Sequence, residues 1–448
     1  MKDMLRVWLR RAEVDWAVFY GVLASVWRLM SSPITMLLIG RCLTPEMQGF
    51  YFTFGSLLAL QSFLELNLTI AVLNVASHEW ARLKLDEAGE IVGDPDALSR
   101  LVSLGRFVFK WYAVACVLFV VGVGTGGYIF FKQDPHPGVM WEGPWWGLVI
   151  LSSLLLWSLP FNALLEGCNQ VTTIQRFRLS QSVLGNLALW PTLALGGGLW
   201  AAVAVTAVGM LRGMYLFGVQ YRRFFKPFFS QPTGQQMNWK TEVWPMQWRL
   251  GLSGIFSYFM FHLFNPVMFH YYGAAVAGQM GMTMSIVSVL REVALKWLQP
   301  KVPRFGMLIA RKDYTDLNRL WWRTTRASVA VAGAGALAIW LVIYGLNALN
   351  VPLVERLLPP LPSGLLLLGT IFMSLGYCYA VYLRAHKQEP LVVLSAVTSL
   401  LMGLLVWWLG SQFGPIGASV AYIVVVGGIS LPWQTVIWFR CRAKWHKT

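Results

Sequence analysis

The sequence predicts an all-α integral membrane protein with about twelve transmembrane helices in two six-helix halves. Three observations support this prediction: of the 448 residues, 56% are hydrophobic, only 12% are charged, and the mean hydropathy is +0.56. A soluble domain carries about 25% charged residues, so this chain has too little polar surface to cover a globule in water. Because one crossing takes roughly 20 residues, the length leaves no room for a kinase, ATPase or nucleic-acid enzyme domain.

Twelve apolar stretches are long enough to cross a bilayer, and polar loops join them. We expect transmembrane helices at residues 17–40, 49–77, 107–131, 145–165, 179–196, 199–219, 250–271, 277–298, 327–349, 363–383, 390–410 and 416–438. The corresponding domains are an amphipathic N-terminal segment 1–16, a first half 17–219, a linker 220–249, a second half 250–438 and a basic tail 439–448.

The distribution of charge predicts the orientation of the chain. The formal net charge is +16, and with twelve spans most Lys and Arg side chains fall on one side of the membrane. Residues 78–106, 220–249 and 299–326 are rich in them, whereas the loops on the other side carry Arg41, Lys132 and Arg356. Cytoplasmic loops carry the excess of Lys and Arg. We therefore expect both termini in the cytoplasm of a bacterium, and a multi-pass protein of its inner membrane.

Two of these cytoplasmic segments have their own character. Residues 78–106 contain mixed acidic and basic side chains and are expected to be a loop. Residues 299–326 have aromatic and basic anchors, which are typical of an amphipathic connector lying along the inner surface.

Several functional classes are excluded by missing patterns. The five cysteines are scattered without a CxxC pair, so we expect neither a disulfide framework nor a metal site. No GxxxxGK[ST] sequence occurs, so ATP hydrolysis does not drive the protein. No small-residue cleavage site follows the charged N-terminus, which predicts that no signal peptide is removed. We expect no catalytic residues, no cofactor and a monomer.

A weak internal repeat relates the two halves. The sequence Glu46-Met47-Gln48-Gly49-Phe50-Tyr51 matches Ala275-Val276-Ala277-Gly278-Gln279-Met280, and residues 168–170 match residues 386–388. Six predicted spans separate the members of each pair. Parallel repeats of this kind place a substrate cavity between the halves of a transporter.

Polar side chains inside the spans predict a hydrophilic interior, because a charge at the bilayer centre costs several kcal/mol. Arg28 shares a helical stripe with Gly21, Ser25, Ser32 and Thr35, next to Pro33. Similar stripes run through the spans at 49–77, 145–165, 250–271, 277–298 and 363–383. The candidate substrate-binding residues are Arg28, Ser25, Ser32, Gln61, Glu65, Asn162, Ser257, His262, Asn265, Ser288, Arg291, Glu292 and Ser374.

Each candidate also has a structural interpretation. Ser and Thr hydroxyls in membrane helices commonly bond one helix to another. Arg28 and Glu65 can neutralise each other as an ion pair. Arg291 and Glu292 can reach the inner membrane surface by snorkelling, and His262 can be a packed core residue.

Three segments resemble a known family. Residues 40–51 (GRCLTPEMQGFY) resemble the R-x-L-x-P-E-x-x-G-x-Y turn of bacterial polysaccharide transporters. Residues 63–68 resemble their acid-x-Gly-hydrophobic stretch, and residues 300–320 resemble their cytoplasmic connector. The similarity implies a flippase for O-antigen or another lipid-linked oligosaccharide, within the multidrug/oligosaccharidyl-lipid/polysaccharide (MOP) exporter superfamily. Two positions depart from the family: Asn67 stands where Gly is usual, and Asn265 where many relatives have an acid.

The resemblance implies a function and its partners. A polyprenyl-diphosphate-linked glycan would move from the inner to the outer leaflet by alternating access, for lipopolysaccharide or other polysaccharide biosynthesis. A glycan polymerase and glycosyltransferases are the implied protein partners, and nucleic acid is not one. Three alternatives stay open: a drug/cation antiporter of the same superfamily, a membrane polysaccharide polymerase or glycosyltransferase, and a non-transporting scaffold.

Overall fold

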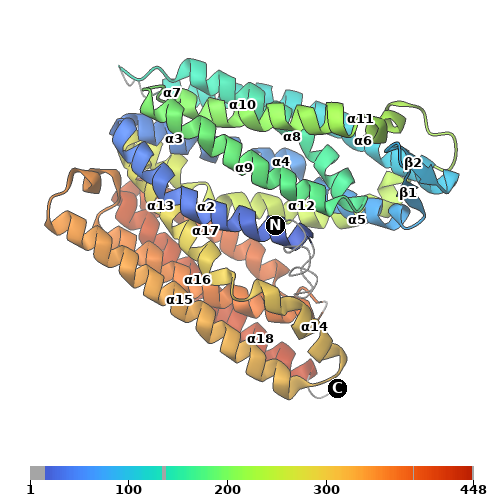
Figure 1. The fold of residues 1–448 in the computed structure, drawn as a ribbon. Coiled ribbons are helices and arrows are strands. Elements are labelled where there is room, and N and C mark those ends of the chain that lie inside the picture. Colours follow the sequence, from blue (N-terminus) through green and yellow to red (C-terminus); the bar gives the residue numbers. More distant parts are fainter. Residues whose placement is uncertain (1–15, 134–137, 387, 446–448) are drawn as a thin grey trace, which may run out of the picture. The chain divides into compact units, whose positions relative to one another are not determined.

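A computed structural model describes residues 16–133, 138–386 and 388–445. These residues form helices except for loops and one two-stranded hairpin, as Figure 1 shows. The all-α prediction is therefore confirmed. Most of the predicted N-terminal segment 1–16 and the last three residues of the predicted basic tail 439–448 lie outside the described residues.

The apolar helices make this a multi-pass membrane protein. Eight described helical segments are long and apolar enough to cross a membrane, or nine if the bent pair Pro45–Glu65 and Leu68–Trp80 is one span. Two of them, Gly254–Ala310 and Val392–Trp445, have 57 and 54 residues, far more than the roughly 20 of one crossing. Each contains a glycine with positive φ, Gly273 or Gly414, at the position of an expected turn. The count of twelve and the cytoplasmic termini stay predictions.

Contacts divide the chain into two compact units. Unit 1 comprises the described residues of Met1–Leu43 together with Leu58–Gly254, and unit 2 comprises Thr44–Leu57 and the described residues of Ile255–Thr448. The helix α3 (Pro45–Leu58) thus packs with C-terminal residues, although α2 before it and α5 after it belong to unit 1. No sequence pattern indicated this exchange.

Unit 1 is a set of packed helices around α8 (Glu142–Gly167) and α9 (Val171–Ala194). The helices α5 (Leu68–Trp80), α6 (Pro95–Leu118) and α10 (Trp200–Tyr215) pack against α8, and α2 (Trp16–Cys42) packs against α9. Its shorter elements are α4 (Gln61–Glu65), η1 (Phe119–Gly124), α7 (Thr125–Lys132), η2 (Leu216–Gln220), α11 (Arg222–Phe225), η3 (Lys226–Phe229) and η4 (Trp239–Val243).

Residues 78–106 are not the loop that the sequence predicted. The strands β1 (Leu83–Leu85) and β2 (Ile91–Gly93) form an antiparallel hairpin, and α6 begins at Pro95. Asp94 caps α6 by accepting from the amide of Asp96, and proline suits the first helical position. The expected span began at residue 107, because charged side chains precede that residue. The cap at Asp94 instead starts α6 at Pro95, twelve residues earlier. The expected span 49–77 is not one straight helix, because it is divided into α3, α4 and α5, and its crossing as a single bent span stays a prediction.

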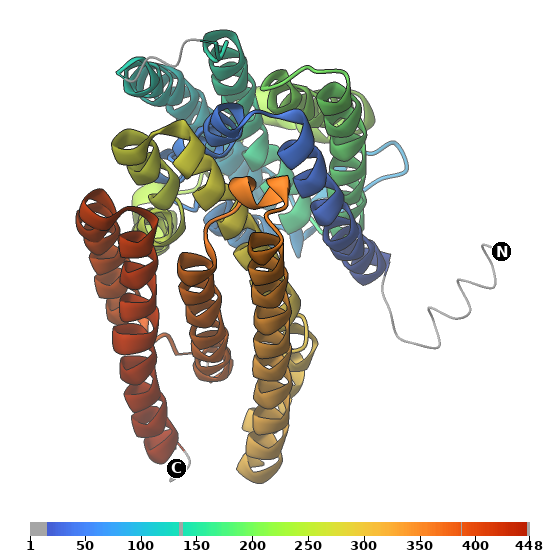
Figure 2. The same cartoon turned by 90° about the vertical axis from the view of Figure 1, so that its left-hand side faces the viewer.

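Two other helices also begin before the spans that the sequence predicted. The expected spans 179–196 and 327–349 belong to α9, which begins at Val171, and to α15 (Tyr314–Ala348). Asp313 caps α15 by accepting from the amide of Asp316. The connector between the membrane helices is therefore shorter than the expected 299–326. It consists of η5 (Gln299–Lys301), α14 (Val302–Ala310) and a turn, and α15 begins at Tyr314. Figure 2 shows α15 as one continuous helix.

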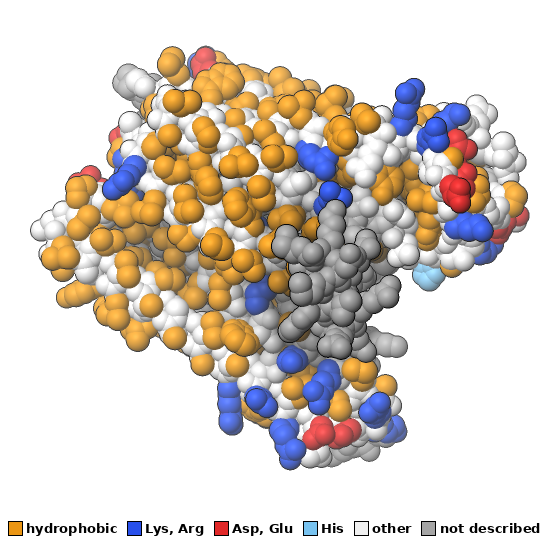
Figure 3. Space-filling model, viewed as in Figure 1, with side chains coloured by type: hydrophobic (Ala, Val, Ile, Leu, Met, Phe, Trp, Pro, Cys, Tyr) orange, Lys and Arg blue, Asp and Glu red, His pale blue; other side chains and the backbone are white. Residues whose placement is uncertain are grey.

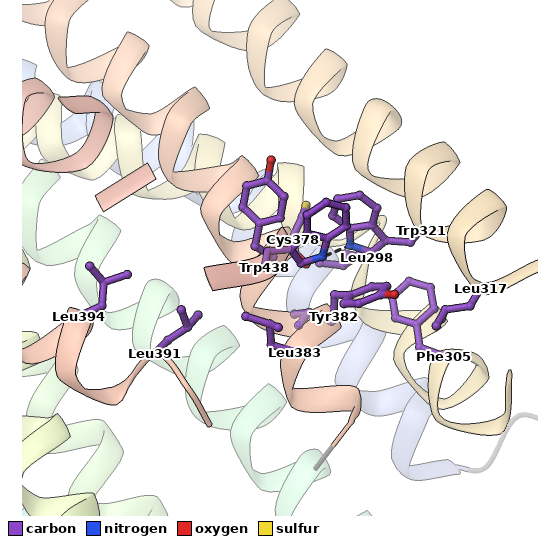
Figure 4. Close-up of a cluster of buried hydrophobic side chains, with 12 residues drawn as sticks. Leu298, Phe305, Leu317, Trp321, Cys378, Tyr382, Leu383, Leu391, Leu394 and Trp438 are labelled. Atoms are coloured by element: carbon purple, nitrogen blue, oxygen red, sulfur yellow. Dashed lines mark hydrogen bonds between the residues drawn. The ribbon is translucent and has the colours of Figure 1, made fainter. Parts of the chain in front are cut away.

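Unit 2 has its own buried core. Its main helices are α13 (Phe264–Leu295), α15, α16 (Pro360–Ala385), α17 (Val392–Ile423) and α18 (Leu431–Trp445), with the C-terminal part of α12 (Trp244–Phe261), η6 (Pro352–Arg356) and η7 (Val424–Ser430). Near the connector, Trp321 stacks on Trp438 and donates its indole N–H to the carbonyl of Cys378 (Figure 4). This cluster fixes α14, α15, α16 and α18 to one another.

Charged side chains gather in restricted parts of each unit. In Figure 3 the helical surfaces in view are largely apolar, while Lys, Arg, Asp and Glu gather around the β1–β2 hairpin in unit 1 and near α14 in unit 2. Large apolar side chains such as Met30, Leu211 and Val342 are exposed on the helices. Such surfaces are expected where lipid, rather than water, surrounds a helix.

Candidate functional site

A break between α4 and α5 positions several of the candidate residues of unit 1. Leu66 and Asn67 both adopt left-handed backbone conformations, with φ of 49° and 51°, and the helices on either side differ in direction by 46°. Asn tolerates this conformation better than most residues with a side chain, so Asn67 can occupy the break in place of a glycine. The glycines that permit close packing lie instead on α12, where a Cβ at Gly254 would lie 3.0 Å from the Asn67 amide nitrogen.

Glu65 is the carboxylate at this break. Its Oε1 accepts a hydrogen bond of 2.9 Å from the hydroxyl of Thr69 across the break, and Gln61 lies one turn earlier on α4. On α6, the buried phenol of Tyr112 has no hydrogen-bond partner among the described residues and lies within electrostatic reach of Glu65. Discontinuous helices with free polar groups are typical of substrate and ion sites in transporters.

Arg28 is an exposed side chain on α2, and Ser25 and Ser32 are partly buried beside it on the same stripe. The Ser25 hydroxyl donates to the Gly21 carbonyl of its own helix at 3.0 Å. Arg28 and Glu65 do not form an ion pair: both are described, and neither takes part in a salt bridge. The structure therefore does not contain the ion pair that the sequence left open.

The helix α9 packs against α2 beside this stripe. Its extension back to Val171 adds Gln175, whose side chain lies 3.6 Å from a Cβ placed on Gly21. Trp190 donates from its indole to the Thr35 hydroxyl at 3.0 Å. The expected span began at residue 179 and left out Gln175, because Arg176 and Arg178 end the apolar pattern and Gln170 provides no side-chain cap before the helix.

Asn162 of α8 has spare hydrogen-bonding capacity. Its Nδ2 donates to the Ser158 carbonyl at 3.4 Å, whereas its buried Oδ1 has no partner among the described residues. Four residues further on, Glu166 accepts from Arg178 of α9 at 2.7 Å. Asn162 therefore stays a candidate, while Glu166 joins two helices.

In unit 2, Arg291 of α13 is the candidate with the most informative surroundings. Its guanidinium lies 4.5 Å from the centre of the Phe261 ring, and Nη1 lies 3.8 Å from the sulfur of Met373. His262, at the break between α12 and α13, is within electrostatic reach. The guanidinium is partly buried, and throughout the described ranges it has no acidic partner.

The other candidates of unit 2 occupy different environments. Asn265 donates to Ser56 Oγ at 3.0 Å and to the Phe52 carbonyl at 3.4 Å, so it connects α13 to α3. Ser374 is fully buried and donates to the Thr370 carbonyl of its own helix. Ser257 and Glu292 are exposed, and Ser288 is partly buried. We keep Arg291 and His262 as the polar pair that the structure brings together.

The described residues contain no group of three His, Cys, Asp or Glu side chains that could hold a metal ion. The polar groups that remain are cationic or hydrogen-bonding: Arg28, Gln61, Asn162 and Arg291, with Glu65 as a carboxylate held by Thr69. Each unit thus has an arginine that can bind an anionic group, because the guanidinium is a rigid, planar set of donors that matches phosphate oxygens.

Comparisons with known proteins identify the fold. No protein-family model and no curated protein matches the chain. Among solved structures, an inward-facing multidrug-resistance MATE transporter of the MOP superfamily is 13% identical, with 96% of both chains covered and a TM-score of 0.62. The lipid II flippase MurJ in an inward closed conformation is 12% identical, with 94% of this chain and 87% of that chain covered and a TM-score of 0.62. The multidrug transporter DinF-BH in complex with R6G is 12% identical over 95% of both chains, with a TM-score of 0.58.

These solved structures include both multidrug transporters and a lipid flippase. At 12–13% identity the likeness concerns the path of the chain and not its substrate. It extends over nearly the whole chain, so the described helices belong to one architecture. The protein therefore has the fold of the MOP-superfamily transporters.

Proposed function

We propose that this protein is a flippase that carries a polyprenyl-diphosphate-linked oligosaccharide across a bacterial inner membrane by alternating access. Arg291 is the observation that carries the proposal. A partly buried guanidinium inside a membrane helix is costly, and among the described residues no carboxylate compensates it. An anionic substrate would supply the missing charge. The diphosphate of a lipid-linked glycan is such a group.

The surroundings of Arg291 support an anion rather than a proton or metal cation. The guanidinium lies over the Phe261 ring and beside Met373, which hold its orientation without neutralising it. In unit 1, Arg28 is an exposed cation on a polar stripe, and Gln61 and Asn162 of the same unit carry amides that can bind sugar hydroxyls. The polyprenyl chain would stay in the lipid.

The nearest alternative is a drug/cation antiporter with the same fold. Such a protein needs carboxylates in its membrane helices to hold organic cations or exchange protons. Glu65 is the candidate carboxylate within the described apolar helices that lies at a helix break, and Asn265 stands where many relatives have an acid. The balance of charge favours the anionic substrate. Glu65 would then be the group through which any proton coupling passes.

Translocation in vesicles tests the proposal. The purified chain is reconstituted with a fluorescent polyprenyl diphosphate, and dithionite bleaches the label that is exposed outside. The wild-type protein should speed exchange between leaflets. Arg291→Gln should slow it by about tenfold or more, since hydrogen bonds to charged groups contribute roughly 1.5–3 kcal/mol. Arg291→Lys should retain part of the rate, because an ammonium keeps the positive charge but cannot donate two parallel hydrogen bonds to a phosphate as a guanidinium does.

Arg212→Gln is the matched control. Arg212 is also a membrane-helix arginine over aromatic rings, Phe177 and Tyr215, but it donates to Ser180 in unit 1. Its loss should leave the rate close to that of the wild type. Equal slowing by both substitutions, or accumulation of ethidium without movement of the diphosphate, would reject the flippase and favour the antiporter.

A further inference from the structure

A groove in unit 1 shares with the residues discussed above only Ser158, whose carbonyl accepts from Asn162. It has a volume of about 800 Å³ and runs between α8 and α10, ending at α11 and η3. The α8 wall is formed by Leu154, Trp157 and Phe161, and the α10 wall by Met210 and Met214. These positions repeat at three- and four-residue intervals, so each set lies on one face of its helix.

Two glycines and a change in helix geometry keep the groove open. After α10 the chain continues as the π-helical turn η2, which contributes Phe217 and Gly218. A Cβ at Gly218 would meet nothing within 4 Å, and one at Gly213 would meet only the Phe217 ring at 3.5 Å. Aromatic rings form the floor of the groove. The centre of the Phe161 ring lies 5.1 Å from the centre of the Phe217 ring and 4.9 Å from that of the Phe225 ring. A wider helix turn is frequent at functional sites.

One end of the groove is basic. Arg222, Arg223 and Lys226 line it there, opposed by a single carboxylate, Glu90, from the loop between β1 and β2. Arg223 Nη1 donates to the Ala88 carbonyl at 3.0 Å, which anchors that loop. Arg222 and Lys226 are exposed and form no ion pair with any described residue. This end therefore has cations without matching anions.

The apolar walls extend onto the surface beside the groove. Met214 and Phe229 are 57% and 67% exposed, and Trp157 is 37% exposed. In a membrane protein such side chains meet acyl chains. A small soluble anion needs no apolar walls of this length, and an apolar partner helix needs no cations. Basic pockets between membrane helices on the cytoplasmic side bind anionic lipid headgroups, and the sequence predicts residues 78–106 and 220–249 to be cytoplasmic.

We propose that this groove binds an anionic phospholipid of the inner leaflet. The phosphate lies against Arg222 and Lys226, where charged donors bind phosphate oxygens strongly. One acyl chain runs along Trp157, Phe161 and Met214. None of these residues belongs to the proposed transport site, so this lipid is a bound neighbour of the transporter and not its cargo.

Lipid retention measured by native mass spectrometry tests the proposal on the full-length protein. The probes are dioleoyl-phosphatidylglycerol and dioleoyl-phosphatidylcholine, which share their chains but differ in net charge. The wild type should retain phosphatidylglycerol preferentially. The double substitution Arg222→Gln, Lys226→Gln should lower that retention by about tenfold or more, since each cation near a lipid headgroup contributes about a fivefold factor.

A second variant tests the apolar walls. Gly218→Trp should fill the groove and reduce retention of both lipids, and Met214→Ser should weaken both without added bulk if the tryptophan variant fails to fold. The control pair Lys301→Gln, Arg323→Gln removes two exposed cations from unit 2 and should leave retention unchanged.

Three results would overturn the proposal. Retention could be unchanged in the Arg222/Lys226 variant, or reduced as much by the control pair. Alternatively, soluble glycerol phosphate could compete as well as the two-chain lipid, which would make the site one for a free anion. Diphosphate translocation measured as above depends on Arg291, so failure of the lipid site and failure of the flippase proposal are distinguishable.

Discussion

Gln48 donates a hydrogen bond of 2.8 Å to the carbonyl oxygen of Gly278, joining α3 to α13 within unit 2. The same Nε2 donates to the Arg356 carbonyl at 3.0 Å, and Gln279 donates to the adjacent Glu355 carbonyl at 2.9 Å. At this crossing a Cβ on Gly278 would lie 2.9 Å from the Gly49 nitrogen. Gly49 and Gly278 are the glycines that the weak sequence repeat matches with each other, so its two members meet in space.

The crossing predicts a strong position dependence for Gly→Ala substitutions in α3. A Cβ at Gly49 would lie 1.8 Å from the Ala274 carbonyl oxygen, whereas one at Gly55 would meet nothing within 4 Å. Gly49→Ala should destabilise the protein by about 1–3 kcal/mol, the usual cost of overpacking. Gly55→Ala should be neutral or slightly stabilising. Thermal unfolding in detergent measures both, and similar melting temperatures for the two variants would contradict the close crossing.

Because Asn67 has a left-handed backbone conformation, glycine should be more stabilising than alanine at this position, the reverse of the order inside an ordinary helix. Asn67→Gly and Asn67→Ala both remove the amide, so their difference reports the backbone alone. With φ of 51°, the alanine variant should be about 1 kcal/mol less stable than the glycine variant. At Gly333 in α15, where a Cβ meets nothing within 4 Å, alanine should instead stabilise by about 0.5–1 kcal/mol. The same sign at both positions would rule out the break between α4 and α5.

Arg28 and Glu65 should behave independently, because no salt bridge joins them. The double variant Arg28→Ala, Glu65→Ala should have an unfolding free energy equal to the sum of the single effects within about 0.5 kcal/mol. A coupling above about 1 kcal/mol would show that the two charges pair in a conformation populated in the membrane.

For transport, Glu65→Gln should abolish any acceleration by an imposed pH gradient, while Arg28→Ala should not.

The ion pair between Glu242 of η4 and Arg100 of α6 predicts that the stability of the protein depends on pH. Hydrogen bonds from the Asn238 amide and from Arg100 lower the pKa of Glu242 below its ordinary value. A carboxyl with a lowered pKa contributes stability above its unfolded-state pKa, and this contribution is lost as the pH falls through the folded-state pKa. Glu242→Gln should therefore lower the melting temperature at pH 7 but have little effect near pH 3. Glu87→Gln, at an exposed position of the hairpin loop, should have little effect at either pH.

Cysteine labelling tests the predicted orientation. Gln235 and Met140 are both exposed, but the charge distribution places them on opposite sides of the membrane. In a background without the five native cysteines, Met140→Cys should react with an impermeant maleimide in intact cells. Gln235→Cys should react only after permeabilisation. Labelling of position 235 from outside would reverse the orientation and place the lipid groove in the other leaflet.

The sequence by itself determined the class of this protein. Apolar stretches and scarce charges require a membrane environment, and this requirement acts on each segment independently of its neighbours. It located α8, α10 and α16 closely, and it located the turns at Gly273 and Gly414, because hydropathy is a local property. It was wrong about residues 78–106 and about the starts of α6, α9 and α15. The caps Asp94 and Asp313 extend α6 and α15 into charged sequence, whereas α9 extends past Arg176 and Arg178 without a side-chain cap.

Only the tertiary structure decided which polar residues meet. Ser374 and Arg291 occupied equivalent polar stripes in sequence, but Ser374 satisfies its hydroxyl within its own helix while Arg291 lies over Phe261 without an acidic partner. The transfer of α3 to unit 2 likewise depends on contacts at Gly49 and Gly278, which are more than two hundred residues apart. The groove at Arg222 and Gly218 combines α8, α10, η2, α11 and η3 of unit 1. Such arrangements arise from packing between segments distant along the chain, and no local pattern of residues encodes them.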